Sequence, residues 1–171
     1  DYLSDLLKRK LIIQQKMGIR ADIREELKKE SVTKIHGQPT SHDLTILEKE
    51  LIAILAGIPT ALGGGNFGHV GVIMEAAAYN TMTAGVDFVN PINPGVYPAG
   101  LAANAAATVR ARAEAEHKEL ISEFETFEGV RQGVKDLILE AVDSEYLMEI
   151  EHETLGFLNR TPRQMLDHLL T

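Results

Sequence analysis

The chain has 171 residues, 44% of them apolar but only 5% aromatic, so it can bury one core built mainly of aliphatic side chains. It has no cysteine, which excludes a disulfide framework and thiolate metal sites, and no stretch approaches the roughly 18 apolar residues of a membrane span. The net charge is −8, with no lysine or arginine in residues 50–109 and a surplus of acidic residues in 110–171, so a phosphate backbone is not the expected partner of the second half.

Residues 1–30 are predicted to form a helical segment in two pieces. Ser4 is a suitable N-cap for the first helix, in which leucines recur at helical spacing, and Gly18 is a suitable end. After it, Ile19, Ile23 and Leu27 repeat at four-residue spacing, which is typical of an apolar helix face. Residues 32–36 are predicted to be extended or a short strand.

The next predicted helix begins at Ser41 or Asp43 and ends at Gly57 and Pro59. Its apolar stripe is Leu44, Leu47, Leu51, Ile54 and Ile58. A short helix is predicted near residues 75–85, and the prolines of residues 88–98 exclude a helix there.

A long, alanine-rich helix is predicted over residues 99–128, with Pro98 in its first turn and Gly129 as its end. Its expected apolar stripe is Leu101, Ala105, Val109, Ala113, Leu120, Phe124 and Phe127. Three shorter helices are predicted to follow: one over 130–141, one capped by Ser144, and a last one opened by Thr161, Pro162 and Gln164 in a capping-box pattern.

Residues 61–71 contain Gly63, Gly65 and Gly68 at the spacing of a dinucleotide-binding loop. A nucleotide site of that kind needs a preceding strand and a following helix, and neither is predicted here. The favoured interpretation is a connecting loop with several positive-φ positions, in which His69 bonds a loop carbonyl. Binding of a phosphate is the alternative.

Two Glu-x-x-His pairs, Glu114/His117 and Glu149/His152, have the spacing of di-iron ligands in four-helix proteins. Glu50 and Glu140 stand in the order needed for the two further carboxylates. The second pair is predicted to face water, opposite Leu147 and Ile150, so a solvated polar face is the favoured interpretation. No metal, cofactor, catalytic residue or small-molecule substrate is predicted.

Two parts of the sequence resemble a known family. Residues 33–51 and the glycine loop are similar to Gag-like proteins of retroelements in algal and related protist genomes. Residues 134–169 resemble the capsid region of copia-type Gag, with Thr161, Gln164, Leu166 and Leu169 at the family's threonine, glutamate, tryptophan and leucine places. The family's usual tryptophan is missing here, and so is the zinc knuckle of many Gag proteins.

The resemblance implies an all-helical capsid lobe over residues 31–171 that self-assembles into a shell, with RNA contact outside this segment. An all-α fold of about six to seven helices is predicted, with residues 1–30 as a separate N-terminal helical segment. The assembly surface is expected in the uncharged residues 58–109, with Pro91, Pro94, Tyr97 and Pro98 in a rigid arm.

Because the chain begins at Asp1 and ends inside an apparent helix, it is expected to be a piece of a longer cytoplasmic protein. A helical scaffold or adaptor of a host cell is the alternative function. A di-iron or nucleotide-dependent enzyme is a further alternative, and no enzymatic activity is predicted.

Overall fold

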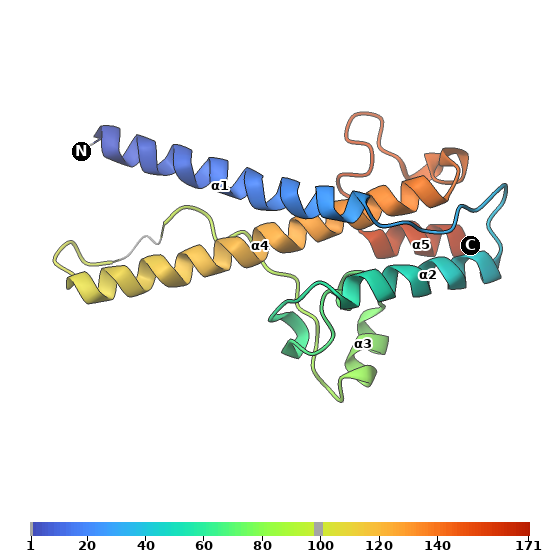
Figure 1. Cartoon of the computed structure of the whole chain (residues 1–171), viewed down its shortest axis with the longest axis horizontal. Coiled ribbons are helices and arrows are strands. Elements are labelled where there is room, and N and C mark those ends of the chain that lie inside the picture. The colour runs from blue at the N-terminus through green and yellow to red at the C-terminus, as the bar shows by residue number, and fades with distance from the viewer. Residues whose placement is uncertain (1, 98–100) are drawn as a thin grey trace.

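The computed structural model describes residues 2–97 and 101–171, and of residues 12–17 it describes the backbone alone. The described residues form helices and loops and contain no β-sheet, which confirms the predicted all-α fold (Figure 1). The α-helices are α1 (Tyr2–Lys28), α2 (Ser41–Ala56), α3 (Ala76–Met82), α4 (Ala107–Ala141) and α5 (Pro162–Leu170). Short 3₁₀ turns lie at Leu62–Gly64, Val70–Val72, Ser144–Tyr146 and Met148–Ile150.

Helix α4 is the longest element, and its bounds differ from those predicted. It begins at Ala107 rather than near residue 99, and the Arg110 side chain donates to the backbone oxygens of Ala103 and Ala105 in the irregular stretch before it. It passes through Gly129 and continues to Ala141, so two predicted helices form one. Pro98, predicted in its first turn, lies outside the described residues.

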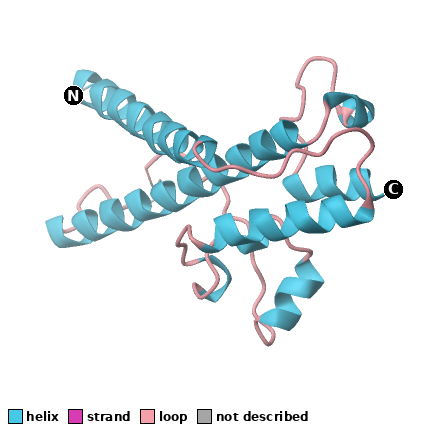
Figure 2. Ribbon diagram, turned by 45° about the vertical axis from the view of Figure 1, so that its right-hand side comes forward, coloured by secondary structure: helices cyan, strands magenta, loops and turns pink. Residues whose placement is uncertain are grey.

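Helix α1 is also a single helix, since Gly18 does not end it and Ser4 lies within it. Because α1 is continuous, its second half crosses α4. At this crossing two arginines of α1 pair with carboxylates of α4. Arg20 donates to both carboxylate oxygens of Glu125, at 2.8 and 3.1 Å, and Arg24 does the same with Asp136, at 2.5 and 2.9 Å. Figure 2 shows that the first halves of α1 and α4 diverge from this crossing.

The core lies between α2, α5 and the second half of α4. Helix α2 buries Leu44, Leu47, Leu51 and Leu55, whereas Ile54 and Ile58 of the predicted stripe are half-buried. The facing side chains are Val130, Val134, Leu137 and Ile138 of α4 and Met165 and Leu166 of α5. Residues 31–36 run extended alongside, with the Ile35 amide donating to the Ala141 oxygen at 2.7 Å.

The N-terminal caps of α5 and α2 are set by residues close to them in the sequence. Thr161 caps α5 and Gln164 completes the capping box, as predicted. Thr40, rather than Ser41 or Asp43, caps α2, and Asp43 is the partner three residues later. The predicted helix after Ser144 is instead a pair of 3₁₀ turns, which still bury Leu147 and half-bury Ile150.

Candidate self-association surface

The first ten described residues of α1 form an exposed apolar helix, which we call the α1 arm (residues 2–11). Its large apolar side chains are 52–80% exposed: Tyr2, Leu3, Leu6, Leu7 and Leu11. In Figure 1 the arm extends from the α4 crossing, well away from α2 and α5. Exposed apolar side chains in such numbers on one helix are typical of a surface that contacts another macromolecule or a membrane.

Leu7 and Leu11 of the α1 arm lie on a different side of α1 from the residues that pack against α4. Leu27 is buried at the crossing, and Ile23 packs there as well. Leu7 precedes Leu27 by twenty residues, which is about five and a half turns at 3.6 residues per turn. The two leucines therefore face nearly opposite directions, and α4 of the same chain cannot cover Leu7.

The tract without lysine or arginine, residues 50–109, is divided between core and surface. Residues 68–70 are buried, as are Ile73 and Tyr79. Beyond Tyr79 the tract turns outward, and the exposed apolar side chains of residues 86–97 are Val86, Val89, Ile92, Val96 and Tyr97. We call residues 86–97 the exposed tract. The assembly surface expected in residues 58–109 stays a prediction, and residues 86–97 hold most of the exposed large apolar side chains in that range.

The expected stripe on the long helix is mostly not buried in this chain. Phe127 is buried, but Val109 and Leu120 are about half exposed. The reason is that α4 begins later than predicted and its first half diverges from α1, so no element of the core covers that length (Figure 2). The first halves of both long helices thus present apolar side chains outward.

The glycine loop lies between α2 and α3 and has several positive-φ positions, as predicted. Gly63, Gly64, Gly65 and Gly68 all have φ between 58° and 85°, in the left-handed region. The Tyr79 hydroxyl donates to the Gly63 oxygen at 2.7 Å, which fixes the loop against α3. Gly68 lies against the backbone oxygens of Leu55, Ala56 and Ile58. These carbonyls at the end of α2 make its surroundings unfavourable for a phosphate.

His69 is held as the sequence predicted. Its Nδ1 lies 2.8 Å from the Ile58 oxygen, so this nitrogen carries the hydrogen and donates it. Its backbone amide donates to the Leu55 oxygen at 3.0 Å. Burial lowers the pKa of His69, which favours the neutral ring. The residue is a structural link between the loop and α2.

The two Glu-x-x-His pairs are not brought together with further carboxylates. Glu114 is exposed while His117 is buried, with its ring edge-on to Tyr97 at 6.0 Å. His152 is exposed, and its Nδ1 accepts from the backbone amides of residues 154 and 155. Glu50 accepts from Thr33. Within residues 2–97 and 101–171, no three histidine or acidic side chains are grouped to hold a metal ion.

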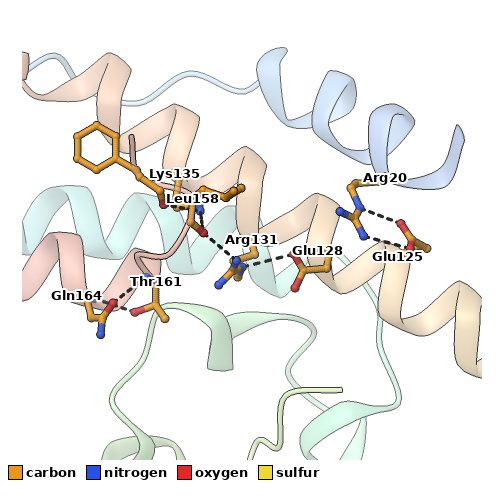
Figure 3. Close-up of polar contacts among 9 residues, drawn as sticks. Arg20, Glu125, Glu128, Arg131, Lys135, Leu158, Thr161 and Gln164 are labelled. Atoms are coloured by element: carbon orange, nitrogen blue, oxygen red, sulfur yellow. Dashed lines mark hydrogen bonds and ion pairs between the residues drawn. The ribbon is translucent and has the colours of Figure 1, made fainter. Parts of the chain in front are cut away.

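Lys135 of α4 is a buried cation that sequence reasoning missed. Its Nζ donates to the backbone oxygens of Phe157 and Leu158, at 3.0 and 3.4 Å, and Arg131 also donates to Leu158 (Figure 3). Burial, together with the nearby Arg131 charge, lowers the pKa of Lys135 to about 8. Because its partners are carbonyls of a loop folded over α4, Lys135 fastens that loop to the helix.

Comparison with known proteins gives no match, whether to a family model, a curated protein or a solved structure. Among the described residues, no helix has the length and apolar character needed to cross a membrane.

Proposed function

We propose that this chain is a self-associating structural protein without enzymatic activity, and that copies contact one another through the α1 arm. The observation that carries the proposal is the exposure of Leu6, Leu7 and Leu11 on the α1 arm, because Leu7 and Leu11 lie opposite the side of α1 that packs against α4. A stable helical core supports the arm, because Arg20 and Arg24 fix α1 to α4 just beyond it.

The size of the hydrophobic effect sets how much surface must take part. Burying one leucine contributes roughly 1.5–3 kcal/mol, whereas association costs roughly 4–15 kcal/mol in lost translational and rotational freedom. Three leucines alone are therefore marginal. The exposed tract, with Val89, Ile92 and Val96, supplies further apolar area for the same purpose.

In its finer form, the proposal is that copies build a shell like that of a Gag-type capsid. The all-helical fold and the protruding arms are compatible with such a subunit, because surfaces that join unlike faces generate rings or extended arrays. The same proposal places the shell subunit in the cytoplasm and assigns RNA contact to regions outside this segment.

The test is size-exclusion chromatography with light scattering, comparing the wild type with the Leu7→Asn/Leu11→Asn variant. The wild type is expected to run as an oligomer at high concentration and the variant as a monomer. Leu170→Asn, at a leucine 52% exposed in α5, is the matched control and is expected to associate like the wild type. A monomeric wild type would remove the basis of the proposal, and ordered particles by electron microscopy would support the shell.

A further inference from the structure

We infer that the α1 arm of one copy docks into a groove beside α4 of a second copy, so that association is head-to-tail. The inference rests on the proposed self-association and specifies the acceptor for the arm. The groove has a volume of about 560 Å³ and lies between residues 59–61 and the stretch 116–126 of α4. It is open on one side.

The groove matches the apolar side of the arm in character and length. Leu120, Pro59 and Ala61 give it an apolar lining, and Leu120 is 54% exposed in the single chain. The stretch 116–126 is about 15 Å long at 1.5 Å per residue, and residues 2–11 span about 14 Å. An arm laid along α4 would therefore cover the whole groove.

The charges of the arm and the groove are opposite. Lys8 and Lys10 flank the side of α1 that carries Leu7 and Leu11, since each lies within one turn of both leucines and on opposite sides of them. On the groove, Glu116, Glu119 and Glu123 provide the acidic rim. Within one chain, the cation Arg20 of α1 already forms an ion pair with the carboxylate Glu125 of α4. Docking would extend that pattern to a second copy.

Two other arrangements fit less well. Parallel, in-register pairing of two α1 arms would bring Lys8 and Lys10 of both copies together, and like charges at such a contact oppose association. Docking of an arm into its own groove is prevented by the crossing. α1 is one continuous helix whose first half diverges from α4, so the arm is held away from the groove of its own chain (Figure 2).

Charge exchange tests the inference. The arm-reversed variant is Lys8→Glu/Lys10→Glu, and the groove-reversed variant is Glu116→Lys/Glu119→Lys/Glu123→Lys. Each variant alone is expected to associate at least tenfold more weakly than the wild type. An equimolar mixture is expected to regain association, because the acidic arm of one variant then meets the basic groove of the other, and the basic arm of the second meets the acidic groove of the first.

The outcomes separate this inference from the proposed function. A wild type that associates while the mixture stays dissociated, or while both variants associate unchanged, would overturn head-to-tail docking and leave self-association standing. A wild type that stays monomeric would overturn both. Wild-type binding to phosphatidylserine vesicles that is lost on arm reversal, without rescue in the mixture, would show that the basic arm serves a membrane surface and would also overturn the inference.

A disulfide experiment gives a second measurement that does not depend on charge. The chain has no cysteine of its own, so Lys10→Cys and Glu119→Cys provide unique thiols at exposed positions. Mixing the two variants under mild oxidation is expected to yield a cross-linked pair containing one of each. A cross-link that forms between two Lys10→Cys chains, with none in the mixed pair, would contradict the inference.

Discussion

Gly129 of α4 lies so close to Arg20 of α1 that a β-carbon on Gly129 would stand 2.9 Å from the Arg20 backbone oxygen. It would also stand 2.9 Å from the Ile23 β-carbon. One turn further along, a β-carbon on Gly133 would run into the Leu27 side chain. The two glycines let the helix backbones approach, and this approach brings Arg20 within reach of Glu125, whose side chain is only 5% exposed.

Gly129→Ala is therefore expected to destabilise the fold by about 1–3 kcal/mol, the usual cost of overpacking, although alanine is the better helix former. Gly18→Ala is the matched control, because Gly18 is also inside a helix but has no neighbour within 4 Å of a β-carbon. That control is expected to stabilise by about 0.5–1 kcal/mol. Urea denaturation measures both, and a Gly129→Ala variant as stable as the wild type would show that the crossing is looser than described.

These glycines also show where sequence reasoning ends. A glycine at the end of an apolar pattern predicts a helix stop, and the sequence predicts such a stop at both Gly18 and Gly129. Both instead continue a helix, and at Gly129 the reason is a helix more than one hundred residues away in the sequence. A partner at that separation leaves no signal in local spacing.

The glycine loop gives a second stability prediction. Gly68 has φ +58° and its β-carbon would stand 2.6 Å from the Leu55 oxygen, whereas Gly37 has φ +74° and open space around it. Alanine at either position is expected to cost about 1–2 kcal/mol of stability because it must adopt the left-handed backbone conformation. Gly68→Ala is expected to cost about 1–3 kcal/mol more than Gly37→Ala because of the carbonyl contact. Equal losses in thermal denaturation would contradict the described packing.

Lys135 predicts how stability depends on pH. Its pKa is about 8 in the folded chain and near the ordinary lysine value in the unfolded chain. Between about pH 8 and pH 10 the unfolded state therefore binds more protons, and the free energy of unfolding rises with pH by at most about 1.4 kcal/mol per unit from this group. Below about pH 8 the contribution is flat.

The comparison with Lys135→Met isolates this effect, because the remaining groups titrate in both proteins. The variant is expected to lack the rise, so the difference between wild type and variant should change with pH in that window. Burial raises the pKa of Tyr79 and of Tyr146, so these groups oppose the rise only above about pH 10. Parallel stability curves for the two proteins would show that Lys135 keeps an ordinary pKa.

The cap of α5 gives a prediction that rests on local sequence. The Thr161 hydroxyl accepts from the Gln164 backbone N–H at 3.1 Å, and the Gln164 side-chain oxygen accepts from the Thr161 backbone N–H at 3.0 Å. Thr161→Ala is expected to cost about 1 kcal/mol. Thr45→Ala, within α2, is the control and is expected to change stability by less than about 0.5 kcal/mol. The Thr45 hydroxyl only donates to the Ser41 backbone oxygen, one turn earlier in the same helix. Equal losses would contradict the role of the cap.

The sequence was sufficient wherever the cause was local. The all-α class, the positive-φ glycines of the glycine loop, the His69 contact with a loop carbonyl and the Thr161 capping box were all predicted and are confirmed. The α1 arm was predicted as helix, but its exposure was not, because periodicity identifies an apolar face without showing what covers it. Lys135 was missed because its partners at residues 157 and 158 reach it through the fold of a loop.

The most direct measurement of the central claim is amide hydrogen exchange of residues 2–11 at low and at high protein concentration. If copies cover the α1 arm, its amides should exchange several-fold more slowly at high concentration, while the buried stretch 130–138 of α4 should be equally protected at both. Exchange of the arm that is fast and identical at the two concentrations would contradict self-association through α1.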